Sequence, residues 1–119
     1  MATFDKAKLS ASTDGAGVKI AAIAASGTVI HTSATGTGDN RFDEIFLWGV
    51  NTATASRKLT LEWGGTTNPD NRIEQTLPSR EGLQPLAPGL ILQNAKVVRG
   101  FATAANVIVV YGYVNKIRP

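Results

Sequence analysis

The residues best suited to chemistry lie in a small polar loop, GGTTNPDN, at positions 64–71. Asn68, Asp70 and Asn71 offer oxygen ligands for Ca²⁺, but the ligand order of an EF-hand loop is absent and a single carboxylate gives weak binding. The two glycines lack the GxxxxGK[ST] frame that cradles phosphate, and no lysine directly follows them. Pro69 fixes one backbone angle, and the neighbouring Asp and Asn accept backbone N–H groups. We therefore expect the loop to turn the chain and to present a surface.

The second candidate for chemistry is His31, the only histidine of a chain that has no cysteine. A zinc site would then need carboxylates for nearly all its ligands, which is unusual. In GTVIHTSA, at positions 27–34, strand alternation places His31 on the opposite face from Ile30. A Ser-His-Asp arrangement is open by residue count, but no GxSxG nucleophile turn accompanies it. We expect a structural or surface histidine and no metal.

Carboxylate pairs are the remaining candidates for catalysis. Asp43 and Glu44 are neighbours, so on a strand they point to opposite faces. Glu62 and Glu74 flank the polar loop and could face each other across a hairpin, as the two carboxyl groups of a glycosidase do. Each has a cation nearby in the sequence, so ordinary cross-strand pairing explains them as well. We predict that the protein is not an enzyme and has no catalytic residue and no cofactor.

Aromatic side chains could bind a sugar, because pyranose rings stack on flat aromatic faces. Trp48 and Trp63, with Tyr111 and Tyr113, are the candidates for such a surface. Trp63 is in register with two leucines of its segment, which favours a place in the core. Trp48 lies in a segment that is apolar on both faces, and this suits the core, a subunit interface or a ligand wall.

The segments that carry these residues have patterns typical of short β-strands. KLTLEW, at positions 58–63, alternates strictly and indicates a half-buried antiparallel strand. VKIAAIAASGTVIHTSA, at positions 18–34, reads as two short strands about a tight turn at Ser26 and Gly27. A helix through KIAAIAA is the alternative, which the nearby glycines disfavour. Further strands are expected over FDEIFLWGVN, NRIEQTL, AKVVRGFA and NVIVVYGYVN. Six or more short strands with turns between them predict an all-β antiparallel β-sandwich.

The last of these segments, NVIVVYGYVN at positions 106–115, is apolar on both faces. One face carries Val107, Val109, Tyr111 and Tyr113, and the other carries Ile108, Val110 and Val114. We therefore expect this strand to be covered twice, by its own core and by something else.

Length and composition limit the classes of protein. A chain of 119 residues forms one domain, which we place at residues 18–119 after an N-terminal arm over residues 1–17 rich in small residues. The net charge is +3, but the cations are scattered singly along the chain, which does not predict nucleic-acid binding. No apolar segment is long enough for a membrane span, and MATFDKAKLS lacks the apolar core of a signal peptide. We expect synthesis in a reducing cytoplasm.

The order and texture of the strands resemble those of a known family. The segments SGTVIHTSATGTG, FDEIFLWGVN, LTLEWGGTTNPDNRI, PGLILQNAKVVRGFA and NVIVVYGYVN, over about residues 18–117, look like those of capsid cement or decoration proteins of tailed bacteriophages. The resemblance implies a jelly-roll-like sandwich with a flexible N-terminal arm. It also implies a homotrimer on the capsid exterior of a virion, made in the bacterial host cytoplasm, that bridges major capsid subunits.

The resemblance supplies no motif for the contacts, so we choose candidates by residue type. The candidate subunit interface is Trp48, Val109, Tyr111 and Tyr113. The candidate capsid contacts are the cations Lys6, Lys8, Arg72 and Arg80, whose charge would favour an acidic shell surface. The expected partners are the major capsid protein and copies of the chain itself, with no nucleic acid and no membrane. The alternative function is a glycan- or receptor-binding module of a phage fibre or spike, based on the two tryptophans and the polar hairpin.

Overall fold

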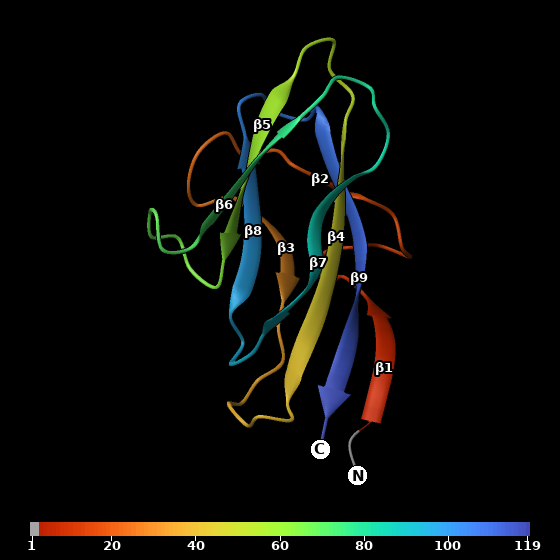
Figure 1. The fold of residues 1–119 in the computed structure, drawn as a ribbon, viewed down its shortest axis with the longest axis vertical. Helices are drawn as coiled ribbons and strands as arrows, with labels where there is room; N and C mark the ends of the chain where they lie inside the picture. Colours follow the sequence, from red (N-terminus) through yellow and green to blue (C-terminus); the bar gives the residue numbers. More distant parts are fainter. Residues whose placement is uncertain (1–2) are drawn as a thin grey trace.

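The chain folds into nine β-strands, with no helix among residues 3–119, which are the residues that the computed structural model describes. The strands are β1 (Thr3–Lys8), β2 (Val18–Lys19), β3 (Thr28–Thr32), β4 (Phe42–Asn51), β5 (Arg57–Trp63), β6 (Arg72–Leu77), β7 (Gln84–Leu92), β8 (Val97–Ala102) and β9 (Ile108–Arg118). They form two antiparallel sheets that pack face to face (Figure 1). The predicted all-β sandwich is confirmed.

The two sheets draw on strands from all parts of the chain. Sheet A has the order β1-β9-β4-β7, with β2 also pairing with β9, and sheet B has the order β3-β8-β5-β6. From β2 onward the chain passes from one sheet to the other at each connection except the β5–β6 hairpin. In Figure 1 the start of β1 and the end of β9 lie at the same end of the molecule.

The core lies between the sheets and follows from the alternation of apolar residues. Leu59 and Leu61 of β5 point inward, and so do Ile108 and Val110 of β9, all of them at most 1% exposed. β9 sits between β1 and β4 and pairs with β4 along its whole length, which makes these two strands the centre of sheet A. The alternation predicted for both segments is confirmed on this inner face.

The outer face of β5 is more buried than predicted. Thr60 is 1% exposed and Glu62 is fully buried, although both point away from the core. Phe101 pairs with Thr60 across the strands, and the Arg72 guanidinium lies 5.2 Å from the centre of the Phe101 ring. Because these large neighbours cover the middle of sheet B, the prediction of a half-buried strand holds only in part.

The predicted turn at Ser26 and Gly27 does not join two paired strands. β2 pairs with β9 in sheet A, whereas β3 pairs with β8 in sheet B, so the segment between them crosses from one sheet to the other. Gly27 is buried in this crossing, and a Cβ there would lie 2.5 Å from the carbonyl carbon of Gly100. The hairpin prediction was wrong because the partners of both strands lie far away in the sequence.

The flexible N-terminal arm is not confirmed. Residues 1 and 2 of the predicted arm lie outside the described part of the chain. β1 pairs with β9 from Thr3–Arg118 to Lys8–Tyr113, and Leu9 is 1% exposed within the core. Most side chains of β1 are exposed, because it is an edge strand and contributes mainly backbone hydrogen bonds.

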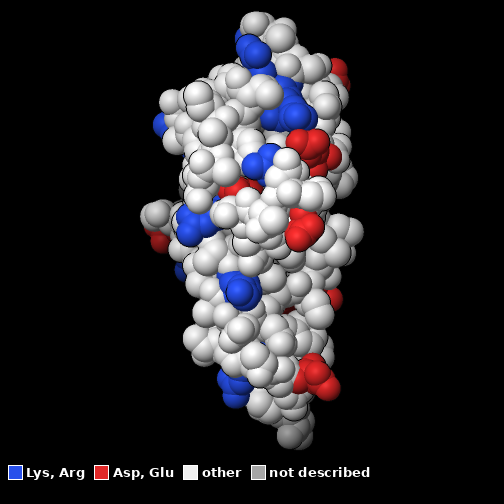
Figure 2. Space-filling view, turned by 90° about the vertical axis from the view of Figure 1, so that its left-hand side faces the viewer, with Lys and Arg blue, Asp and Glu red and all other residues white. Residues whose placement is uncertain are grey.

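Charges of both signs share the outer face of sheet B. Figure 2 shows this side of the molecule, where Lys and Arg form separate groups along the long axis and Asp and Glu lie beside them. One such contact is the ion pair of Lys58 with Glu74, whose atoms are 3.2 Å apart and whose side chains are about half exposed. An ion pair at this exposure contributes little to stability.

Candidate functional site

The most distinctive surface is a cluster of aromatic side chains on the outer face of sheet A, which we call the aromatic face. It consists of Phe46 and Trp48 from β4 and Tyr111 and Tyr113 from β9. Phe46 pairs with Tyr113 and Trp48 pairs with Tyr111 across the strands, so all four side chains project from the same side. Val109 lies on this side too, opposite Val50. The structure thus brings together all four candidate interface residues.

The rings of the aromatic face pack on one another. The ring centres of Phe46 and Tyr113 are 4.9 Å apart at an interplanar angle of 17°, and those of Trp48 and Tyr113 are 6.1 Å apart at 27°. Lys6 of β1 places its ammonium nitrogen 4.2 Å from the centre of the Tyr113 ring. Tyr111 is 41% exposed. Stacking and the cation–π contact give the cluster a fixed, flat shape.

Two glycines let the chain itself cover the margins of this face. A Cβ at Gly17 would overlap the Val109 side chain and lie 2.8 Å from Tyr111 Cζ. A Cβ at Gly89, which has a φ of +96°, would lie 2.9 Å from Phe46 Cζ. Part of the second cover predicted for residues 106–115 is therefore supplied by the chain's own loop at Gly17, whereas Gly89 of β7 covers Phe46.

Trp63 does not belong to the aromatic face. It lies at the end of β5 in sheet B, packs against the hydrophobic core, and donates its indole N–H to the Ile91 carbonyl at 3.4 Å. The sequence-based preference for core packing of Trp63 is confirmed. Phe46 takes its place in the cluster; its even spacing from Trp48 in FDEIFLWGVN was the signal that could have found it.

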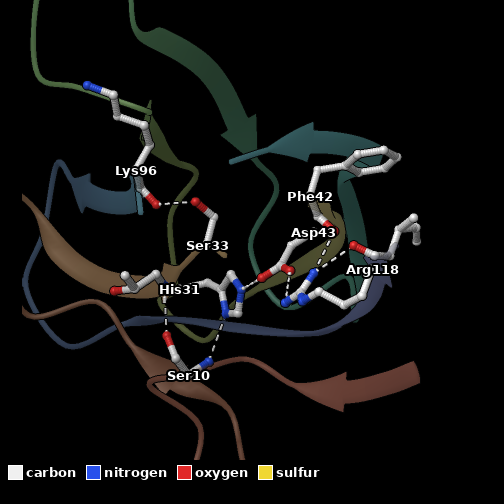
Figure 3. A network of polar contacts seen from close by, with 9 residues as sticks. Ser10, His31, Ser33, Phe42, Asp43, Lys96 and Arg118 are labelled. Atoms are coloured by element: carbon white, nitrogen blue, oxygen red, sulfur yellow. Dashed lines mark hydrogen bonds and ion pairs between the residues drawn. The ribbon is translucent and has the colours of Figure 1, made fainter. Parts of the chain in front are cut away.

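His31 lies in a buried polar network that joins four segments of the chain (Figure 3). Its Nε2 is 2.6 Å from Oδ2 of Asp43, and the other oxygen of Asp43 is 3.0 Å from Arg118 Nη2. The Ser10 backbone N–H donates to His31 Nδ1 at 2.9 Å. His31 is 2% exposed and Asp43 is 1% exposed.

The partners of the ring fix its role. A backbone N–H can only donate, so His31 Nδ1 must accept from Ser10, and Nε2–H must donate to Asp43. Both ring nitrogens are thus used inside the protein, and neither faces solvent or a nucleophile hydroxyl. A general base needs a ring nitrogen within reach of a reacting proton. The geometry assigns this histidine to structure, as the sequence predicted.

The strand face of His31 was predicted wrongly. Ile30 and His31 are both buried, although neighbours on a regular strand point to opposite sides. The pairing of β3 with β8 shifts between Val29 and His31, where a β-bulge places one extra residue in β3. The bulge turns His31 inward, toward Asp43.

The two candidate carboxylates, Glu62 and Glu74, lie in different environments. Glu62 is fully buried and accepts the Gly27 N–H at 2.6 Å, whereas Glu74 is exposed and paired with Lys58. Glu62 stands directly opposite Arg72 of the neighbouring strand, not opposite Glu74. The ion pair with Lys58 explains Glu74, whereas Glu62 is held by the Gly27 N–H and forms no ion pair within residues 3–119.

The polar loop at positions 64–71 is organised by its own side chains. The Asn71 amide accepts the Thr67 N–H at 3.1 Å and donates to the Trp63 carbonyl at 3.1 Å. Because the Asn71 amide is already engaged, it is not free to bind Ca²⁺. Among residues 3–119 no three His, Cys, Asp or Glu side chains lie close enough to hold a metal. The loop turns the chain from β5 to β6, as predicted.

The four candidate capsid contacts do not share one surface. Lys6 and Lys8 lie on β1 at the edge of sheet A, and Arg72 lies on β6 in sheet B. Arg80 lies in the connection from β6 to β7, where its backbone N–H donates to the Asn51 carbonyl at 2.9 Å. A single flat partner cannot contact all four, so as a set they describe no one interface.

Comparison with known proteins adds no relative. The chain matches no protein-family model, and neither the curated proteins nor the solved structures contain a significant match. Within the described residues no helix is long and apolar enough to cross a membrane. The resemblance to phage cement proteins therefore stays a prediction based on the sequence segments.

Proposed function

We propose that this protein is a structural protein of a phage virion, which binds the outer surface of the capsid and stabilises the shell by bridging major capsid subunits. In this proposal it acts as a homotrimer, and the aromatic face is the contact between subunits. It carries out no chemical reaction and needs no cofactor.

The observation that carries the proposal is the aromatic face itself. Trp48, Tyr111 and Tyr113 form a preorganised, partly exposed surface on the central strands of sheet A. Tryptophan and tyrosine are enriched at protein interfaces, where large rigid side chains bury much area at low entropic cost. Association would cover on the order of 300 Å² of apolar surface per subunit, which is worth several kcal/mol at about 25 cal/mol per Å².

The strand order is a second, weaker support. A sheet of order β1-β9-β4-β7 facing one of order β3-β8-β5-β6 agrees with the jelly-roll arrangement that viral capsid proteins use. Many unrelated proteins share that arrangement, so it supports the proposal only together with the surface.

Light scattering coupled to size exclusion gives the first test. We expect a mass near three times the 12.5 kDa subunit, and a smaller mass for Trp48→Ala. In the second test the protein is mixed with purified shells of its own phage and sedimented, and we expect saturable binding. Protein that stays monomeric and never sediments with the shells contradicts the proposal.

The same surface supports a second candidate, a glycan-binding module. The near-parallel rings of Trp48 and Tyr113 offer a flat face for a sugar ring, with the polar Glu44 and Asn115 beside them, 3.1 Å apart. A glycan array is the direct test. Binding that is lost in Trp48→Ala favours this function over the capsid, and an array without any binding removes it.

A further inference from the structure

A pocket of about 250 Å³ opens beside the polar loop that turns β5 into β6. One side is formed by Gly64, Gly65 and Thr66 of that loop. The other side comes from a segment some thirty residues later, where Lys96 and Arg99 line the pocket together with Ala95 and Val97. The two sides are held together by a hydrogen bond from the Gly64 N–H to the Val97 carbonyl at 3.0 Å.

The charges that line the pocket are all positive. Lys96 and Arg99 are both cationic, no carboxylate lines the pocket, and neither residue forms an ion pair with any residue from 3 to 119. Glu62 stands opposite Arg99 in the neighbouring strand and is fully buried. One of its oxygens accepts the Gly27 N–H, and the other has no partner within residues 3–119. Arg99 itself makes one long hydrogen bond, 3.5 Å, to the Gly27 carbonyl.

The backbone around the pocket presents further donors. No hydrogen bond within residues 3–119 uses the N–H of Gly65 or Thr66. Gly64 has a φ of +77°, and turns of this kind let successive N–H groups form concave anion sites. The two N–H groups, the Thr66 hydroxyl and the two cations therefore belong to residues that line one pocket.

The backbone at Lys96 is set by a turn. Ala95 has a φ of +57°, which is uncommon for a residue with a side chain. The Ser33 hydroxyl donates to the Lys96 carbonyl at 2.9 Å, and in Figure 3 the Lys96 ammonium points away from the buried network. Backbone strain of this kind concentrates at ligand sites.

We propose that this pocket binds a phosphate group, either as free inorganic phosphate or as a phosphate monoester. A phosphate monoester carries a charge of roughly −1.5 to −2 at pH 7, which the two cations match. Its oxygens point in several directions and suit donors from two opposite loops, whereas a planar carboxylate suits a single bidentate partner. The site is independent of the aromatic face and of the role proposed for that face.

The test is a titration of ¹⁵N-labelled protein with sodium phosphate, at constant ionic strength kept with sodium chloride. We expect saturable shifts of the Gly65 and Thr66 amide signals. In Lys96→Gln the dissociation constant should rise about tenfold, the value of one charge-assisted hydrogen bond. Lys96 is exposed, so the variant should fold, and its amide spectrum verifies this. The matched control is Lys58→Gln, an exposed cation outside the pocket, which should bind phosphate as tightly as the unaltered chain.

Two further ligands identify the source of the phosphate. Glucose 6-phosphate binding as tightly as inorganic phosphate supports a monoester, and inorganic phosphate binding alone supports the free ion. Glutamate should bind at least about tenfold more weakly than phosphate, because each of its carboxylates carries only one negative charge. Shifts that do not saturate, an unchanged affinity in Lys96→Gln, or glutamate binding equal to that of phosphate would overturn the assignment.

Discussion

Replacing Asp43 by alanine tests the polar network that joins the N-terminal loop, β3, β4 and the end of β9. The carboxylate is 1% exposed and receives the His31 N–H at 2.6 Å and the Arg118 guanidinium at 3.0 Å. Removing it leaves the buried imidazole N–H without an acceptor. Arg118 loses less, since its side chain is 25% exposed and still donates to two backbone carbonyls.

We therefore expect Asp43→Ala to lower the free energy of unfolding by about 3 kcal/mol, the upper end of the range for leaving a buried hydrogen-bond donor without its partner. This is a large share of the roughly 5–15 kcal/mol that holds a small domain together. The assay is urea denaturation followed by tryptophan fluorescence, at one protein concentration because self-association adds to apparent stability.

The neighbouring residue supplies the control. Glu44 lies on the outer face and makes one hydrogen bond, to Asn115, so Glu44→Ala should cost less than about 1 kcal/mol. A double-mutant cycle with His31→Ala should show a coupling energy of about 1 kcal/mol or more between His31 and Asp43. A loss below about 1 kcal/mol for Asp43→Ala, or additive effects in the cycle, would refute the reasoning.

Three further predictions test the packing and the hydrogen bonds. In ¹⁵N spectra, His31 should carry its proton on Nε2, since Nδ1 accepts a backbone N–H; a proton on Nδ1 would contradict the network. Gly17→Val should lower the free energy of unfolding by about 1–3 kcal/mol, because its side chain would overlap Val109, and an unchanged urea midpoint would show that this loop yields. Asn71→Ala should lower the free energy of unfolding by about 1 kcal/mol, since the partly buried Trp63 carbonyl loses its donor, whereas water can reach the exposed Thr67 N–H; an unchanged melting temperature would mean that water replaces both partners.

Local patterns predicted the strands well. Alternation over residues 58–63 and 106–115 is set by the two-residue period of a strand, so the inward-facing leucines and valines could be read directly from the sequence. Pro69 and Asn71 predicted the hairpin turn, because both favour a turn through backbone angles and hydrogen bonds within a few residues.

Features that depend on distant residues were not predictable. β2 and β3 belong to different sheets because β2 pairs with β9 and β3 pairs with β8. Nothing within residues 18–34 indicates these partners. The bulge before His31 turns this side chain to the other face of the strand. A strict two-residue alternation does not predict such a change. Glu62 reads as a solvent-facing residue, and only the structure places Gly27 on its carboxylate.

The residues of the proposed phosphate pocket come from two distant segments, so no continuous motif marks them. Phosphate motifs place glycines and lysine in one continuous segment, and here no lysine directly follows Gly64 and Gly65. The fold supplies Lys96 and Arg99 from the other side instead, because β8 pairs with β5 and brings the two turns together. The sequence therefore shows that Lys96 and Arg99 are present, but not that they lie close to Gly64 and Gly65 in the fold.

The aromatic face and the phosphate pocket lie on different sheets, with the hydrophobic core between them. Trp48 projects from sheet A, whereas Arg99 belongs to the outer side of sheet B. Sites that share no partner and lie far apart act independently unless a variant disturbs the fold. Trp48→Ala should therefore weaken self-association and leave the phosphate affinity unchanged. Lys96→Gln should weaken phosphate binding and leave self-association unchanged. Loss of both properties in either variant would mean that unfolding, not a lost contact, is being measured.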